Sequence, residues 1–139
     1  MIEFCIKSKP ENVALACSRV RTAAANAGMA EQGLMELELA VSEAVTNSIE
    51  HAYEWDESQD ILVKMNPLND HIEVDILDHG IPVPVNLFND LDDNFEDPDD
   101  ELALLAENGR GLKIIRALVD DIRIEHVNGW NSLRLQKKF

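Results

Sequence analysis

The chain has 139 residues, of which 45% are hydrophobic, and its formal net charge is -15. This length and composition suit one folded domain with a substantial core and argue against disorder. The acidic balance argues against general nucleic-acid binding and against binding to anionic membranes, because both need a basic surface. It favours a protein that docks on basic partner surfaces.

The first half of the chain predicts one short strand and two helices. Residues 2–6 alternate in polarity, which is typical of a strand. A helix is expected over about residues 10–27, with Ser8 as its cap and Gly28 as its end. Helical periodicity then continues from about 31 to 53, so we expect one long second helix there.

The second half predicts a sheet that is buried on one side. Its apolar and polar residues alternate, as in antiparallel sheets with one solvated face. The predicted elements are strands at 61–66, 71–77, 122–126 and 132–139 and a helix at 112–118. Asn128-Gly129 predicts a tight turn between the last two strands. No repeat or second domain is evident, so residues 1–139 are expected to form a single domain.

Two cysteines and the lack of long apolar runs indicate the cell compartment. Cys5 and Cys17 are embedded in apolar patterns, so we expect two buried thiols in a reducing compartment. No stretch approaches the ~20 apolar residues of a membrane span, and the first ten residues do not resemble a signal peptide. The expected location is the cytoplasm, with no membrane partner and no direct nucleic-acid partner.

One face of the second helix carries polar groups that chemistry can use. Glu43, Asn47 and His51 recur at steps of four and therefore stack on one helix face. Asn47 offers a neutral oxygen of the kind that Mg²⁺ accepts. Glu43, one turn away, could deprotonate a hydroxyl, whereas His51 is expected to be structural. The alternative is a solvated polar stripe.

A glycine-containing turn follows the strand at 71–77. Asp78 stands at the strand end, where a carboxylate can accept a hydrogen bond from the exocyclic amine of adenine. Gly80 allows close approach of the backbone to a flat base, and Pro82 stiffens the exit. An ordinary strand-end turn is the alternative.

A second glycine pair precedes the helix predicted at 112–118. Gly109 and Gly111 leave backbone amides free to face phosphate at a helix N-terminus. Arg110 adds a planar donor fork and Lys113 a further positive charge. A turn between two helices is the alternative.

An acidic segment at 86–107 separates the two glycine motifs. Its part 86–101 contains eight carboxylates, and 65–109 contains no lysine or arginine. A loop this long inside a compact domain is usually a lid or a disordered segment. The carboxylates would repel a polyphosphate unless Mg²⁺ or a basic partner surface intervened.

Taken together, these stretches resemble the GHKL nucleotide-binding superfamily. ELELAVSEAVTNSIEHAY (36–53) is similar to its N box, DHGIP (78–82) to its first glycine box and NGRGLKIIRALVDDI (108–122) to its second. The wording SEAVTNSIEHAY makes the chain most similar to the bacterial anti-sigma-factor serine/threonine kinases. The resemblance implies an α+β, histidine-kinase-like (Bergerat-type) ATPase fold. This is a two-layer α/β sandwich with a mixed, mostly antiparallel sheet and helices on one face.

The resemblance also implies ATP and Mg²⁺ as cofactors and assigns roles to residues. Glu43 matches the general base, Asn47 the Mg²⁺ ligand and Asp78 the adenine-binding aspartate. The implied ATP-binding residues are Asn47, Asp78, Gly80, Pro82, Gly109, Arg110, Gly111, Leu112 and Lys113. Residues 86–107 correspond to the lid over the triphosphate. Some related kinases carry a basic residue just before the second glycine box, where this chain has Glu107 and Asn108.

The implied activity is phosphorylation of a serine on a small anti-sigma antagonist protein. Such a kinase otherwise holds a sigma factor and is usually a homodimer. Two alternatives remain open. One is an ATP-binding regulatory module with weak or no catalysis that binds a signalling partner, which the acidic lid favours. The other is a histidine-kinase ATP-binding domain, which the lack of a helix pair with an acceptor histidine disfavours.

Overall fold

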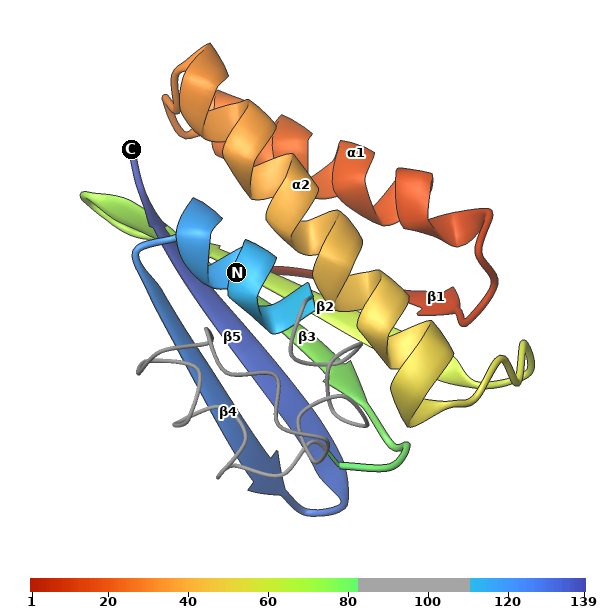
Figure 1. Cartoon of the computed structure of the whole chain (residues 1–139). Helices are drawn as coiled ribbons and strands as arrows, with labels where there is room; N and C mark the ends of the chain where they lie inside the picture. Colours follow the sequence, from red (N-terminus) through yellow and green to blue (C-terminus); the bar gives the residue numbers. More distant parts are fainter. Residues whose placement is uncertain (83–110) are drawn as a thin grey trace.

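The computed structural model describes residues 1–82 and 111–139 and has two layers, a sheet and helices that cover one of its faces (Figure 1). The elements are β1 (Ile2–Lys7), α1 (Asn12–Asn26), α2 (Glu31–Asn47), η1 (Ser48–Ala52), β2 (Asp60–Pro67), β3 (His71–Asp78), a helix over 111–118, β4 (Asp121–Val127) and β5 (Trp130–Lys138). The acidic segment 86–107, Gly109 and Arg110 lie outside the described residues, so the predictions made for them stay predictions.

The five described strands form one sheet in the order β1-β2-β3-β5-β4. All four pairings are antiparallel, so this sheet is wholly antiparallel rather than mixed. The expected α+β sandwich with helices on one face is confirmed (Figure 1). Because β3 lies at the centre, its C-terminal residue Asp78 stands opposite Asn131 of β5, in the interior of the sheet.

The sheet is buried on its helix-covered face, as the alternating polarity predicts. The side chains of β2 and β3 that point toward the helices are at most 2% exposed; they are Ile61, Val63, Met65, Ile72, Val74 and Ile76. Burying apolar area contributes roughly 25 cal/mol per Å², so this face supplies much of the core. Asp78 continues the same inward alternation and is also buried.

Small residues on α1 pack against larger ones on α2. Ala16, Val20 and Ala24 of α1 and Leu37 and Val41 of α2 are fully buried. Short side chains allow the two helices to approach closely over the sheet (Figure 1). Gly28, with φ +107, ends the segment as predicted.

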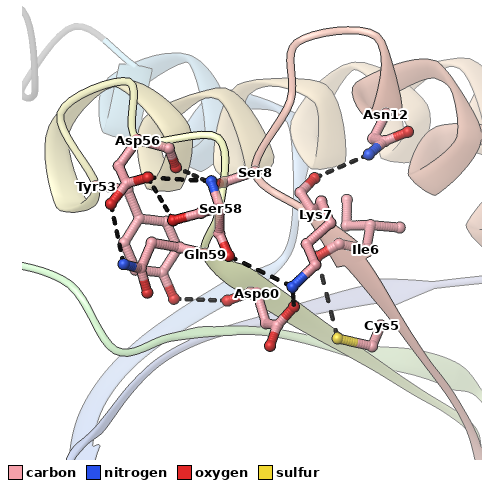
Figure 2. Close-up of polar contacts among 10 residues, drawn as sticks. All are labelled: Cys5, Ile6, Lys7, Ser8, Asn12, Tyr53, Asp56, Ser58, Gln59 and Asp60. Atoms are coloured by element: carbon pink, nitrogen blue, oxygen red, sulfur yellow. Dashed lines mark hydrogen bonds and ion pairs between the residues drawn. The ribbon is translucent and has the colours of Figure 1, made fainter.

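The first helix begins later than the sequence suggested, and Ser8 is not its cap. α1 starts at Asn12, and the capping position, Glu11, makes no side-chain hydrogen bond to the helix. Ser8 is buried instead and donates its hydroxyl to the carbonyl of Asp56, which lies in the turn after η1 (Figure 2). The cap prediction was wrong because a partner distant in sequence took the hydroxyl.

The turn before β2 is held by one carboxylate and one ion pair (Figure 2). Asp56 accepts hydrogen bonds from Ser58 and Gln59, and these bonds lower its pKa to about 2. Lys7 of β1 pairs with Asp60 of β2 at 2.8 Å. The contacts tie the start of β2 to the end of β1.

The helix predicted over 31–53 changes its geometry at Ser48. α2 ends at Asn47, and η1 continues as a π-helix in which the Tyr53 amide donates to the Ser48 carbonyl, five residues back, at 2.9 Å. A π-turn is wider than an α-turn and is frequently found at functional sites. Glu43, Asn47 and His51 therefore do not share one regular α-helical stripe.

The predicted hairpin at Asn128-Gly129 is confirmed. Of the two cysteines predicted to be buried, only Cys17 is. Asn128 and Gly129 both have positive φ, 54 and 82, as a type I′ turn requires. Cys17 is buried, which raises its pKa to about 11. Cys5 is exposed because it lies on the face of β1 that no described helix covers. Among the described helices, none has both the length and the apolar character needed to cross a membrane.

Candidate functional site

Asp78 accepts three hydrogen bonds at the end of β3. The Ser48 hydroxyl donates to its Oδ2 at 2.9 Å, and the Gly80 amide and the Asn131 side-chain amide donate to its Oδ1 at 3.0 and 2.8 Å. The side chain is 7% exposed. An ionised carboxylate has about four acceptor positions. The site therefore holds a fixed, buried carboxylate that can still accept a hydrogen bond from a donor in the neighbouring pocket.

Gly80 fits against the backbone of η1 so closely that no side chain can replace its hydrogen. A Cβ built at Gly80 would lie 2.2 Å from the carbonyl oxygen of Ala52. The next amide, that of Ile81, donates to this same oxygen at 2.9 Å. Main-chain atoms alone thus hold the first glycine motif (78–82) against the end of η1.

Tyr53 supports the same junction from the other side. Its hydroxyl donates to the Asp60 carbonyl at 2.5 Å and accepts the His79 amide at 2.7 Å. Burial raises the pKa of Tyr53 to about 12. The hydroxyl holds the backbone directly after Asp78 in place.

Asn47 and Gly111 bring the helix motif against the second glycine motif. A Cβ at Gly111 would lie 2.9 Å from both Nδ2 and Oδ1 of Asn47. Gly111 and Leu112 are buried at the start of the helix over 111–118, whereas Lys113 is exposed. Glycine at position 111 therefore lets the Asn47 carboxamide lie directly against the chain at the beginning of that helix.

A pocket opens between α2, η1, the helix over 111–118 and the ends of three strands. It is lined by Ala44, Asn47, Ser48, Ala52, Ile76, Asp78, Ile81, Leu112, Ile124, His126, Asn131, Ser132 and Leu133. Apolar walls with a few polar groups at fixed positions are typical of small-ligand sites. Asn47, Asp78 and Leu112, which lie far apart in the sequence, share this pocket as the motif analysis predicts.

Other candidate residues lie outside the pocket lining. Gly80 contacts Ala52 and Gly111 contacts Asn47, and both of these partners line the pocket, whereas Pro82 is exposed. Glu43 is half-buried on α2, one turn before Asn47, and forms no hydrogen bond or ion pair within residues 1–82 and 111–139. Its carboxylate is therefore not committed to any described partner.

Sequence reasoning missed two residues of the site. Ser48 was given no role, although it lies among apolar residues at helical spacing, and its hydroxyl donates to Asp78. Asn131 follows the tight turn and carried no motif, yet it donates both to Asp78 and, at 2.8 Å, to the Gly80 carbonyl. A buried polar residue inside an apolar stripe was the available signal for Ser48. Only the strand register reveals Asn131.

The residues that would hold ATP can be compared with this geometry. Asp78 lines the pocket and has acceptor capacity left, and glycine at positions 80 and 111 lets the backbone lie directly against Ala52 and Asn47. No group of three or more His, Cys, Asp or Glu that could hold a metal occurs in the described part of the chain. Mg²⁺ in a nucleotide site needs few protein ligands because phosphate and water supply the others. The residues present fit a nucleotide with Mg²⁺.

Comparison with known proteins gives concordant matches. Residues 6–137 match the family described as histidine kinase-like ATPase domain. The serine-protein kinase RsbW of Oceanobacillus iheyensis is 34% identical over 128 residues, 92% of this chain and 80% of that protein. RsbW of Bacillus cereus (strain AH187) is 32% identical over 132 residues, 95% of this chain and 81% of that protein.

A solved structure shows the same fold. The crystal structure of the RsbU and RsbW domains of a Mycobacterium tuberculosis protein matches 98% of this chain with a TM-score of 0.67 and 20% sequence identity. The present chain spans 31% of that longer chain.

Proposed function

Because this chain belongs to the histidine kinase-like ATPase domain family, and within it to the serine-protein kinases RsbW, we propose that it transfers phosphate from ATP to a serine of a protein. The observation that carries the proposal is the junction at Asp78. There a buried carboxylate, held by three donors, faces a pocket that also contains Asn47. The motif that would bind adenine, at Asp78, and the motif that would bind Mg²⁺, at Asn47, thus meet in one site.

The proposed ATP contacts follow from the positions of the described residues. Asp78 would accept the exocyclic amine of adenine, while Ile76, Ile81 and Leu112 supply apolar pocket walls for the base. Asn47 would give its side-chain oxygen to Mg²⁺, which neutralises phosphate charge. Gly111 and Lys113 would lie on the phosphate side, together with Gly109 and Arg110, at a helix N-terminus that favours anions.

Glu43 is the proposed general base. It would take the proton from the serine hydroxyl as that oxygen attacks the terminal phosphate of ATP, giving phosphoserine and ADP. Its half-buried position one turn before Asn47, with no described partner, supports this role. Because Glu43 lies one turn from Asn47, the proton would be removed close to the Mg²⁺ that neutralises the phosphate charge.

The proposed partners are a sigma factor and a small anti-sigma antagonist protein that carries the target serine. The chain would bind the sigma factor in one nucleotide state and phosphorylate the antagonist in another, so that the bound nucleotide decides which partner is held. A homodimer is the proposed assembly, and the cytoplasm, where sigma factors act, is the proposed location. The net charge of -15 favours basic partner surfaces.

The first experiment measures ATP binding by calorimetry with and without Mg²⁺, for the wild type and Asp78→Asn. The substitution turns one of the two acceptor oxygens into an NH₂ donor, which takes the Oδ2 position because Gly80 and Asn131 both donate to Oδ1. Fewer acceptor positions then remain for the amine of adenine, so we expect binding to weaken at least about tenfold. Mg²⁺-dependent binding that Asp78→Asn weakens supports the proposed site. Absence of ATP binding by the wild type would contradict it.

The second experiment separates a kinase from a binding module without useful catalysis, which the acidic segment 86–107 favours. Phosphate transfer to a purified antagonist is compared for the wild type and Glu43→Gln. A kinase with Glu43 as base should lose about 100-fold or more in rate while its ATP affinity stays within about twofold. ATP binding with no transfer by the wild type would favour the binding module.

A further inference from the structure

Three polar side chains form a row across the sheet beneath the pocket. His126 of β4 stands opposite Asn131 of β5, and Asn131 stands opposite Asp78 of β3. The Nδ1 of His126 lies 2.8 Å from the Oδ1 of Asn131, and the Nδ2 of Asn131 lies 2.8 Å from the Oδ1 of Asp78. All three residues line the same pocket. The row thus joins the outer hairpin to the carboxylate at the centre of the site.

The hydrogen-bond partners of Asn131 determine which atoms in this row donate and which accept. The Asn131 amide nitrogen faces two acceptors, the Asp78 carboxylate and the Gly80 carbonyl, so its NH₂ must point that way. The Asn131 carbonyl oxygen then points at His126. That oxygen can only accept, so the Nδ1 of His126 must carry a proton and donate. A reversed amide would place oxygen against oxygen twice.

We propose that His126 is a positioning residue for base recognition, acting through Asn131 on the Asp78 carboxylate. The hydrogen bond from His126 holds the Asn131 amide in the one orientation that donates to Asp78 and Gly80 together. Asp78 is thereby kept as an acceptor for an amino group on the bound base. The inference rests on the proposed function, because it takes that base to be the adenine of ATP.

Without His126, the side-chain oxygen of Asn131 loses the partner that it has among residues 1–82 and 111–139, and the amide is no longer held from β4. The consequence is specific to the part of the ligand that Asp78 contacts. A nucleotide without the exocyclic amine gains nothing from a well-oriented carboxylate at this position. The dependence on His126 should therefore be seen with ATP and be absent with purine riboside 5′-triphosphate, which lacks only that amine.

The test measures the affinity of both nucleotides by calorimetry in the presence of Mg²⁺. The variants are His126→Leu, which removes the donor, and His126→Gln, whose side-chain amide can still donate to Asn131. His79→Leu is the matched control, because His79 bonds the Gly129 carbonyl and contacts the Trp130 ring in the same hairpin but is not in the pocket lining. Thermal unfolding of each variant checks that the hairpin is intact.

We expect His126→Leu to weaken ATP binding about threefold to tenfold, as for the loss of one hydrogen bond. Binding of purine riboside 5′-triphosphate should stay within about twofold of the wild type, and His126→Gln should restore ATP affinity. His79→Leu should leave the ratio of the two affinities unchanged.

Two results would overturn the inference while the proposed function stands: unchanged ATP affinity in His126→Leu, or equal weakening of both nucleotides. Failure of the wild type to bind ATP would overturn the proposed function and the inference with it. A wild type that binds ATP no better than the nucleotide without the amine would show that Asp78 does not bind the amine. That result would reject the inference and the proposed contact between Asp78 and adenine, while the proposed phosphate transfer from ATP would stand.

Discussion

The two glycine motifs are attached to the rest of the site in different ways. At the first, Gly80 and Ile81 contact the Ala52 carbonyl, so backbone lies on backbone. At the second, Gly111 contacts the Asn47 carboxamide, so backbone lies on a side chain. Main-chain atoms at the end of η1 and in the bend directly after β3 can move only together with the chain around them, whereas a side-chain amide can rotate about its own bonds.

Because of this difference, we expect one end of the site to be rigid and the other to be adjustable. The end at Asp78 is built from groups that are hydrogen-bonded to one another around a buried carboxylate, which suits recognition of a rigid base. The end at Asn47 can adjust its amide, which suits a metal and phosphate groups whose positions change during transfer. Replacing the glycine at the first end should therefore lower stability most, whereas replacing the glycine at the second end should chiefly lower ligand affinity.

The largest effect is expected for Gly80→Ala. The new Cβ would meet the Ala52 carbonyl at 2.2 Å, and neither backbone can yield without moving η1 or β3. We expect a loss of about 3 kcal/mol in the free energy of unfolding, seen as a melting temperature lower by roughly 10 °C. Gly33→Ala is the matched control, because its Cβ would meet the flexible side chain of Met29 at 2.9 Å inside a helix. Equal losses in both variants would contradict the rigid first junction.

A smaller effect is expected for Tyr53→Phe at the same junction. The change removes the donor to the Asp60 carbonyl and the acceptor for the His79 amide. Losing these bonds should cost about 1–2 kcal/mol of unfolding free energy in urea denaturation. A variant as stable as the wild type would show that the hydroxyl does not hold the strand end.

Tyr53 should also make the stability of the protein depend on pH in the alkaline range. The pKa of Tyr53 is raised to about 12 in the folded state, against about 10 in an unfolded chain. The raised pKa contributes stability that is fully present below pH 10 and is lost as the pH rises to 12. The wild type should therefore lose more stability than Tyr53→Phe between pH 10 and 12. Parallel curves for the two proteins would contradict the assignment.

The smallest effect on stability is expected for Gly111→Ala. Its Cβ would displace the Asn47 carboxamide, which can rotate away, so unfolding free energy should change by less than about 1 kcal/mol. Affinity for ATP with Mg²⁺ should nevertheless fall about threefold to tenfold, because the proposed metal ligand has moved. A loss of stability as large as in Gly80→Ala would remove the contrast between the two junctions.

The sequence by itself determined the features that depend on neighbouring residues. Strands at 61–66 and 71–77 were predicted from alternation, and the structure places β2 and β3 there. The Asn128-Gly129 turn was predicted from the backbone freedom of its residues, which have positive φ as expected. Periodicity and turn chemistry act over a few residues, so a local reading can find them. The three motifs likewise identified Asn47 and Asp78, which the structure brings into one pocket.

Only the tertiary structure decided which polar groups meet. Ser8 bonds a residue 48 positions away, Ser48 bonds Asp78 at a separation of 30, and Asn131 bonds Asp78 at 53. The partner of each side chain depends on strand order and register, which local patterns do not contain. The end of η1 has such a partner too, since the Ala52 carbonyl accepts the amide of Ile81, 29 positions further along the chain. Buried polar groups must find partners wherever the fold provides them, so their contacts follow the packing and not the neighbouring sequence.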